Sequence, residues 1–383
     1  MIENGPMTDL RAAIGRYAER FHTAVGGEHH VASPLGAWLL LALAGSAAPG
    51  DERLADALGM SPEEAARSAE ALLKEPHPLV AAATAVWHTH WVRPEAMADW
   101  RDRLPVATEV GALPDQAGLD RWASDHTYGM IERFPITITP DVALVLGSAL
   151  ATKVTWQAPF ELGAPTSLGP RSPWAGQVTE VLRSPETHRA FIAGSRSAGQ
   201  VAVHIAAADG GLEVRSVAAA PDVEPARVIA AAHEELAPLS LYDLPLGETD
   251  LWNLREVEST SPGSELHQAF LPAWSVTSQH DLSAPGLGFG AVADVLAPLL
   301  RVPPGGFQAA QSATARYDRY GFEAAAVSGF ALMAGAAHRQ TGIARRADLR
   351  FGHPYAVIAV ASPHEPGPWH RLPVFSAWVA SPR

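Results

Sequence analysis

Few side chains in this sequence stand at the spacings that reactive groups usually need. His88 and His90 lie two residues apart in an apolar run, so on a strand they would share one face, as a pair of metal ligands does. No third ligand is recognisable beside them, so hydrogen-bonded histidines are the simpler interpretation, and His29 and His30 are expected in a polar turn. The sequence also lacks a Gly-x-Ser-x-Gly elbow, a phosphate-binding loop and a zinc signature. We therefore expect no metal site, no cofactor and no familiar set of catalytic residues.

A long segment near the C-terminus could act in a different way. Residues 320–335 carry a single charge and consist mainly of small residues, and the polar, basic stretch at 336–346 follows them. Read with a period of two, either face of this segment could be buried in a sheet, yet Ala and Gly favour strands only weakly. The pattern suits a loop that can insert into a sheet, and the other interpretation is a plain flexible loop.

The elements that would hold this segment follow from capping signals and hydrophobic periodicity. Ser33 and Pro34 mark the start of a buried helix, because Ser is a good N-cap and Pro fits the first helical turn. Expected helices cover residues 9–21, 35–48, 61–73, 119–134 and 223–239, and expected strands cover 79–91, 142–152, short runs within 178–220, 267–276, 355–361 and 374–379. Because regular βαβ alternation is absent, we expect an α+β fold in a single domain over residues 1–383.

Composition limits the classes of binding partner and the cellular location that we expect. The net charge of −13 argues against nucleic acid and against anionic membrane surfaces as partners. The sequence contains no cysteine, which excludes disulfides and thiolate chemistry. No secretory signal is visible, and the uncharged stretch at 35–48 is shorter than the roughly 20 residues that a membrane-spanning helix needs. We expect a cytoplasmic, monomeric protein.

Several motifs, taken in their order and spacing, resemble those of the serpin superfamily. The motifs are the Ser-Pro helix at 33–44, Ala57-Leu58-Gly59, the helix at 119–131, Lys153-Val154-Thr155-Trp156 with Pro159-Phe160, Leu271-Pro272 followed by Asp281-Leu282, Gly321 to Ala326, His353-Pro354-Tyr355 and Ser381-Pro382. The resemblance covers nearly the whole chain and suggests a divergent bacterial member. It implies a serpin fold, with a large, mostly antiparallel central sheet of five strands, surrounding helices and an exposed reactive loop at about 321–350.

The resemblance also implies a mechanism. A target protease cleaves the reactive loop and is trapped as an acyl-enzyme, while the freed loop inserts into the central sheet as a new strand. The residues that would form the hinge of the loop are Arg319, Gly321, Phe322, Glu323, Ala324, Ala325 and Ala326. Family spacing from Gly321 places the scissile bond at Gly335-Ala336, which suits a protease that prefers small residues. If extra length precedes the bond, Arg339 or Arg345-Arg346 become candidates for a trypsin-like protease.

Some positions depart from the family pattern where the mechanism is most demanding. Phe322 stands where inhibitory members have threonine, and a ring there would overpack the sheet at a cost of roughly 1–3 kcal/mol unless a pocket receives it. Arg319 stands where a glutamate is usual, which reverses the charge. Ser148 and Gln311 align with a buried asparagine and histidine that bond beneath the opening of the sheet. Ser33 and Trp156 match the family at that opening, where Trp156 has a structural role.

These observations leave three functions open. The first is inhibition of a serine or cysteine protease by loop cleavage and insertion. The second, motivated by the departures at the hinge, is a non-inhibitory binding module that takes up an extended peptide by strand addition. The third is recruitment of the fold as an enzyme in a peptide natural-product pathway, for which no residue constellation argues. The expected partner is accordingly a protease or an extended peptide.

Overall fold

Capping side chains start the first helices. Ser33 caps α2 (Pro34–Gly45) through its hydroxyl, which accepts a backbone hydrogen bond at 3.2 Å. Ser61 and Glu64 form a capping box at the start of α4 (Pro62–Lys74). Every residue of α2 is buried, so this helix is the centre of the helical layer.

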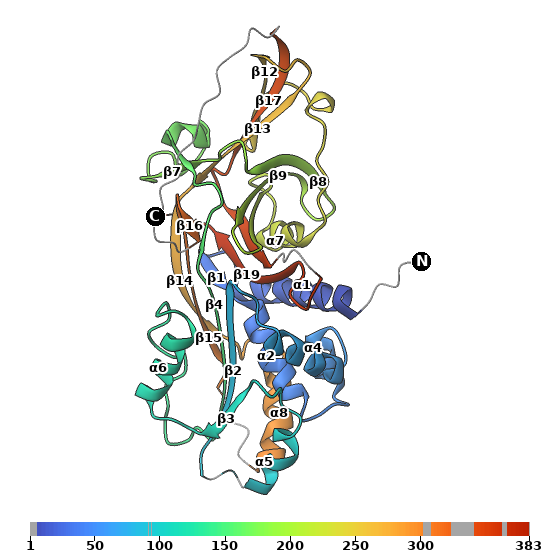
Figure 1. Cartoon of the computed structure of the whole chain (residues 1–383), viewed down its shortest axis with the longest axis vertical. Helices are drawn as coiled ribbons and strands as arrows, with labels where there is room; N and C mark the ends of the chain where they lie inside the picture. The colour runs from blue at the N-terminus through green and yellow to red at the C-terminus, as the bar shows by residue number, and fades with distance from the viewer. Residues whose placement is uncertain are drawn as a thin grey trace.

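The computed structural model describes residues 6–90, 92, 94–301, 308–322, 341–361 and 366–382. The helices of this part are α1 (Pro6–Val25), α2, α3 (Glu52–Leu58), α4, α5 (Pro94–Arg101), α6 (Gln116–His126), α7 (Pro225–His233), α8 (Phe289–Leu300) and the short η1 (Pro165–Leu168) and η2 (Leu241–Asp243). Figure 1 shows α2, α4 and α8 on one side of the central strands and α6 on the other. Within the described ranges, no helix is both long enough and apolar enough to cross a membrane.

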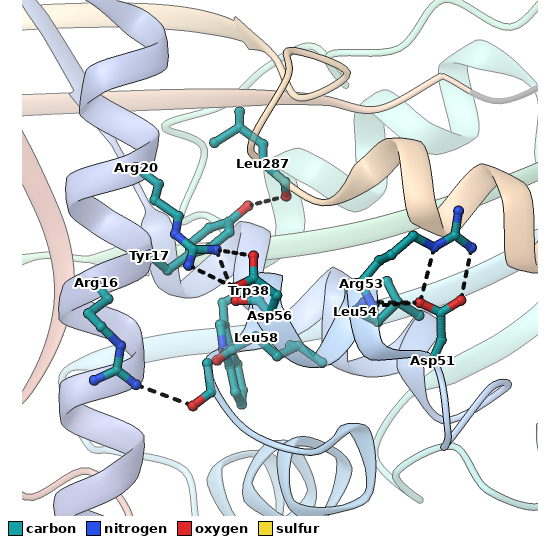
Figure 2. Close-up of polar contacts among 11 residues, drawn as sticks. Arg16, Tyr17, Arg20, Trp38, Asp51, Arg53, Leu54, Asp56, Leu58 and Leu287 are labelled. Carbon is teal, nitrogen blue, oxygen red and sulfur yellow. Dashed lines mark hydrogen bonds and ion pairs between the residues drawn. The ribbon is translucent and has the colours of Figure 1, made fainter.

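Buried polar contacts tie the helical layer together (Figure 2). The Tyr17 hydroxyl of α1 donates a hydrogen bond to Leu287 O, just before α8, at 3.1 Å. Trp38 Nε1 of α2 donates to Leu58 O, at the end of α3, at 3.0 Å. Each bond satisfies a donor that burial would otherwise leave unpaired, which would cost about 1–3 kcal/mol. The two contacts therefore hold α1, α2, α3 and α8 in one register behind the sheet.

The strands form two six-stranded sheets and a central sheet in two parts. The first sheet is antiparallel and has the order β1 (His30–Ala32), β19 (Leu372–Val379), β18 (Tyr355–Ala361), β10 (Leu212–Ala218), β9 (Gly199–Ala208) and β8 (Arg189–Ser195). The second has the order β11 (Gly247–Glu248), β12 (Trp252–Ser259), β17 (Gly342–Arg350), β13 (Glu265–Pro272), β7 (Val181–Arg183) and β6 (Glu161–Gly163). The central parts are β3 (Glu109–Ala112), β2 (Val80–His88) and β4 (Leu144–Thr152), and β14 (Trp274–Asp281), β15 (Ala310–Tyr317), β16 (Gly321–Phe322) and β5 (Val154–Thr155).

The central sheet is mostly antiparallel, as expected. β2 pairs antiparallel with β4 along its whole length, β14 pairs antiparallel with β15, and only β2 and β3 run parallel. β5 continues β4 after Lys153, and β16 pairs with both β5 and β15. The two parts therefore join in one layer, in which the five longer strands follow the order β3, β2, β4, β15 and β14. Helices on both sides of this layer and separate, mostly antiparallel sheets confirm the predicted α+β class.

Two expected helices are shorter in the structure. The helix expected at 119–134 ends at His126, because Tyr128 and Gly129 take left-handed backbone conformations with φ of 53° and 78°. The helix expected at 223–239 ends with α7, because the next residue is already extended. Neither helix ends at a proline, so the endings were hard to predict.

Strand boundaries and one histidine also differ from the prediction. The strand expected at 267–276 is two strands in different sheets, β13 and β14, and the chain changes sheets at Ala273. His30, expected in a polar turn, is the first residue of β1 and is only 3% exposed. The loop expected to reach about residue 350 ends earlier, because residues 342–350 form β17, in which Ala344, Ala347 and Leu349 are buried. α8, β12 and β15 were not predicted.

The turn between β17 and β18 leaves no room for a side chain. A Cβ added at Gly352 would lie 2.2 Å from Leu168 O. Gly352→Ala is therefore expected to destabilise the protein by about 1–3 kcal/mol, since a backbone carbonyl cannot move away cheaply. Chemical denaturation measures the loss, and Gly176→Ala, where a Cβ meets open space, is the matched control. Equal stability of the two variants would contradict this close approach.

Candidate functional site at the opening of the central sheet

The central sheet is open along the boundary between β4 and β15. In the described residues, β4 pairs with β2, and β15 pairs with β14 and, at its last residue, with β16. The two halves meet at one end, where Phe322 of β16 pairs antiparallel with Tyr317 of β15 and with Val154 of β5. Below that point, the facing edges of β4 and β15 have no strand partner among the residues that the structure describes, although buried backbone groups are normally paired.

Asp318 shapes the turn that leads from β15 into β16. Its Oδ1 accepts hydrogen bonds from Tyr320 N at 2.8 Å and Gly321 N at 3.1 Å, and its backbone N donates to Gly321 O at 3.1 Å. Trp156 ties the turn to β5, because its Nε1 donates to Asp318 O and its backbone N donates to Tyr320 O, each at 3.0 Å. The turn reverses the chain, so Phe322 points back between the two halves of the sheet.

Arg319 fastens this turn without an acidic partner among the described residues. Its Nε donates to Phe160 O at 3.0 Å, and its carbonyl accepts from Phe160 N at 2.9 Å. Its guanidinium carbon lies 5.2 Å from the centre of the Tyr320 ring, within cation–π range. The reversed charge at this position is therefore accommodated by a carbonyl and an aromatic ring.

The ring of Phe322 lies in an aromatic cluster at the closed end of the boundary. It is 5% exposed and meets Trp274 of β14 edge to face, with 6.4 Å between ring centres. Tyr317 stacks on Trp274 at 5.9 Å and lies 5.1 Å from the Trp156 ring. Burial raises the pKa of Tyr317, so its hydroxyl stays neutral. A pocket thus receives Phe322, which relieves the overpacking that the sequence suggested.

Three cavities follow the open boundary away from Phe322. The first, of about 10 Å³, is lined by Phe322 itself, Thr152 of β4 and Thr314 of β15. The second, of about 30 Å³, has Ser148 and Gln311 in its wall and α6 along one side. The third, of about 110 Å³, lies between the start of β4 and α8. The side chains along the two strand edges therefore leave an interrupted channel.

The N-terminus of α2 is bonded to β15 beside this channel. Gln311 Oε1 accepts a hydrogen bond from Ser33 N at 2.9 Å, and Gln311 Nε2 donates to Ser33 O at 2.8 Å. Ser33 Oγ donates to Val374 O at 3.0 Å. A Cβ added at Gly36 would lie 3.2 Å from Ser33 Oγ and 3.3 Å from Ser148 Oγ, so both hydroxyls lie beside the same turn. The structure thus brings Ser33, Ser148 and Gln311 together.

A much larger cavity lies between α1, α7 and the first six-stranded sheet. Its volume is about 1030 Å³, and its lining includes Phe191, Ile205 and Ile358. Arg215 also lines it, and one Nη1 donates to two backbone carbonyl oxygens at the end of α7, at 3.3 and 3.4 Å. Burial lowers the pKa of Arg215, while nearby glutamates oppose this effect. A partly buried guanidinium beside apolar side chains suits an acidic ligand with an apolar body.

Comparison with known proteins gives a consistent result. No family model and no curated protein matches this sequence. Solved structures match it over essentially the whole chain: Serpin48 of the insect Tenebrio molitor (14% identity, 100% of both chains, TM-score 0.63), the thermophilic serpin Tengpin in its native state (13%, 100% of this chain and 95% of that one, 0.64) and human thyroxine-binding globulin with thyroxine (14%, 98% of both chains, 0.64). This protein has the serpin fold.

Within this serpin fold, part of the expected site lies together. Arg319, Gly321 and Phe322, expected in the hinge of the loop, lie together in the turn between β15 and β16, which Trp156 holds against β5. The expected residues that lie outside the described part of the chain are Glu323, Ala324, Ala325, Ala326, Gly335, Ala336 and Arg339. The expected scissile bond at Gly335-Ala336 and the alternative at Arg339 therefore stay predictions.

Arg345 and Arg346 lie in the middle of β17, paired with β12 on one side and β13 on the other. Arg345 Nη1 donates to Leu241 O at 2.7 Å and to Leu244 O at 3.0 Å. Arg346 Nε forms an ion pair with Asp348 at 2.8 Å. A protease needs an extended segment with free backbone groups, so β17 would have to leave its sheet before cleavage at either arginine.

The histidine pair of the sequence is divided by the end of a strand. His88 ends β2, and its Nδ1 donates to Thr89 O at 3.1 Å, whereas His90 lies beyond the strand. In the described ranges, no group of three or more His, Cys, Asp or Glu side chains is arranged to hold a metal ion.

Two functional residues escaped the sequence analysis. Asp318 carries a signal that could have revealed it, since Asp-x-x-Gly at 318–321 is a common turn pattern. Arg215 carries none, because its cavity is formed by α1, α7 and strands that are distant in the sequence.

Removal of the Gln311 amide tests the contact beneath the serpin sheet. Gln311→Ala leaves Ser33 N and Ser33 O without their partner, and each unsatisfied buried group costs about 1–3 kcal/mol. We expect the free energy of unfolding to fall by about 2–4 kcal/mol in chemical denaturation. Gln279→Ala, on the exposed side of β14, is the matched control and should change stability by less than about 0.5 kcal/mol. A loss no greater than that of the control would refute this role of Gln311.

Proposed function

We propose that this protein inhibits a protease by cleavage and insertion of its loop. The segment 323–341 connects β16 in the central sheet with β17 in the neighbouring sheet and would present the bond that is cut. The observation that carries the proposal is the antiparallel pairing of Phe322 with both Tyr317 and Val154 above an unpaired boundary. The first loop residue after Gly321 already has the direction and register that further insertion would continue.

The sequence of the loop suits this register on the inner face of the sheet. Two residues beyond Phe322, Ala324 would lie opposite Ala315 and Thr152, which are both buried. In the same register, Ser328 would lie opposite Gln311 and beside the small cavity between β4 and β15. Small side chains fit a narrow channel, and the new strand would pair the free edges on both sides.

The outer face of the same register is complementary in charge. Glu323 would lie opposite Arg316 of β15 and Lys153, which precedes β5, and both basic side chains are exposed. Opposite charges on directly paired strands contribute roughly 0.2–1 kcal/mol each. A slip by one residue would turn Glu323 toward the core, so this contact also favours one register.

The chemistry of the trap follows from the ordinary reaction of a protease. Its serine or cysteine attacks the carbonyl carbon of the scissile bond and forms an ester or thioester, and the peptide nitrogen leaves as a new amino terminus. The candidate bonds Gly335-Ala336 and the bond after Arg339 lie in the connecting segment, which makes them better candidates than Arg345-Arg346 in β17. Insertion of the acylated part of the loop would then carry the enzyme along the sheet.

Limited proteolysis of the segment 323–341 tests this function. We expect the melting temperature to rise by at least about 10 °C after the cut, because several new strand hydrogen bonds at about 1 kcal/mol each would form. Phe322→Asp would place a charge at a position that is 5% exposed and should abolish the rise, whereas Phe322→Leu should retain it. Calorimetry of the intact and nicked protein measures each change.

Incubation of the intact protein with a panel of proteases separates the alternatives. A complex with a protease that survives denaturing electrophoresis would support inhibition. A rise in melting temperature without such a complex across a broad protease panel would instead favour the uptake of an extended peptide by strand addition. No rise, together with complete turnover of the loop, would overturn the proposal of insertion.

A second function, carriage of a small acidic ligand, is favoured by the cavity beside Arg215. The structural neighbour thyroxine-binding globulin was solved in complex with thyroxine. The cavity of about 1030 Å³ in this chain reaches the size range of small-molecule sites, and its lining combines apolar side chains, charged side chains of both signs and the partly buried guanidinium of Arg215. A ligand with an aromatic or aliphatic body and one carboxylate would contact the apolar side chains and pair with the Arg215 guanidinium.

Titration with thyroxine, followed by tryptophan fluorescence, tests this second function. Arg215→Met is expected to weaken binding about tenfold or more, because a charge-assisted hydrogen bond contributes about 1.5–3 kcal/mol. Arg101→Met, at an exposed residue at the end of α5, is the control and should bind as the parent does. Equal affinities of the Arg215 variant and the parent, or no binding at all, would count against a carrier of such acids.

A further inference from the structure

Three histidines from separate elements meet in the interior. His22 of α1, His30 of β1 and His280 of β14 are 2%, 3% and 7% exposed. The ring centres of His22 and His30 are 4.8 Å apart, and those of His30 and His280 are 5.8 Å apart. Among the described residues, none of the three forms an ion pair with a carboxylate. Such a group has no counter-ion ready for an added proton.

The hydrogen bonds of this cluster fix where its protons lie. His30 Nδ1 donates to Glu28 O at 2.8 Å, so His30 Nε2 is the acceptor of the bond from His22 Nδ1 at 2.6 Å. His22 Nε2 then accepts from Ser376 Oγ at 2.6 Å. Every ring nitrogen of His22 and His30 is thus used with both rings neutral. A proton added to His30 Nε2 would force His22 to change tautomer or to lose this bond, and it would place a positive charge in the interior without a counter-ion.

The same place joins β14 and β15 to the body of the protein. His280 Nε2 donates to Val31 O at 2.7 Å, and Ser278 Oγ accepts from Val31 N at 3.1 Å. Gln311, directly opposite His280 in the ladder of β14 and β15, bonds both backbone groups of Ser33. Three side chains of this strand pair, Ser278, His280 and Gln311, therefore hydrogen-bond the backbone of residues 31–33.

The surroundings favour neutral rings. Burial lowers the pKa of His22, His30 and His280 below the ordinary value, for His30 to about 4, and the neighbouring histidines lower those of His22 and His30 further. The other titratable or charged groups that face the cluster are His29, which precedes β1, His233 of α7 and, beside His233, Arg11 and Arg215. Because the folded pKa values lie below the unfolded value of about 6.5, the stabilisation is complete above pH 6.5 and is lost as the pH falls toward 4.

We propose that His22, His30 and His280 form an acid-sensitive latch that keeps the open boundary between β4 and β15 of the central sheet from widening. Protonation separates β14 and β15 from residues 31–33 and widens the boundary with β4 in the uncut protein. The opening itself needs no protease and no loop cleavage. Its consequence, easier entry of a strand, rests on the proposed function.

Hydrogen–deuterium exchange of the uncut protein at pH 7.5 and pH 5.5 tests the latch. Each histidine that regains an ordinary pKa on opening multiplies the open population about tenfold between these two values. After correction for intrinsic exchange, amide protection in β14 and β15 should therefore fall at least tenfold at pH 5.5. Protection in β12 should stay unchanged, because neither this strand nor its partner β17 contains a histidine and the latch does not hold them.

Two variants link the response to the cluster. His30→Gln and His280→Gln each remove one titrating ring, and glutamine at position 280 can still donate to Val31 O. Each should reduce the acid response of β14 and β15 about tenfold, whereas His370→Gln, an exposed histidine elsewhere, should leave it unchanged. An unaltered response in both cluster variants, or an equal loss of protection in β12, would overturn the latch.

A labelled peptide with the sequence of residues 323–334 separates this inference from the proposed function. Faster uptake by the uncut protein at pH 5.5 than at pH 7.5, lost in His280→Gln, would support both the latch and strand entry. Acid opening in the exchange experiment without uptake of the peptide would support the latch and count against insertion.

Discussion

The unpaired boundary between β4 and β15 is the constraint on which the rest of the structure depends. Backbone groups that lack a ladder partner are costly when buried, so the boundary is stable only if neighbouring side chains cover it and hold the two halves at a fixed separation. α6 covers it on one face, Phe322 fills one end and Gln311 fixes the middle against α2. α6, Phe322 and Gln311 each lie where an additional strand would otherwise pair, which explains why all three are found along the boundary between β4 and β15.

The structure changes how Phe322 is interpreted with respect to loop insertion. In the sequence, a ring at the hinge argues against insertion, because it would have to enter a tight sheet. In the structure, the ring already lies between β15 and β5, and Trp274 and Tyr317 complete its pocket. Further insertion would begin with Glu323 and the alanines after it, which are smaller. Phe322 thus already occupies the first position that an inserted strand would take. In the proposed insertion, the energy barrier depends on the channel beyond Phe322.

Local signals predicted the parts of this fold that local physics decides. The serine caps at Ser33 and Ser61, the buried α2 and the strand at β4 required only neighbouring residues. The acceptors of Arg319 could not be predicted, because Phe160 is brought near it by tertiary packing alone. The same holds for His30, whose burial depends on α1 and β14, and for Arg345, whose strand pairs with segments about 90 residues earlier in the chain.

One strand pair carries both control points of the open sheet. Tyr317, at one end of β15, pairs with the hinge, and Gln311, six residues before it, holds Ser33, with His280 as its cross-strand neighbour. Paired strands tend to move together, so in the proposed latch the release of residues 31–33 at one end would shift the partner of Phe322 at the other. Gln311 and His280 lie opposite each other in this strand pair, and both bond the backbone of residues 31–33. The proposed latch and the turn at Phe322 therefore act on the same two strands.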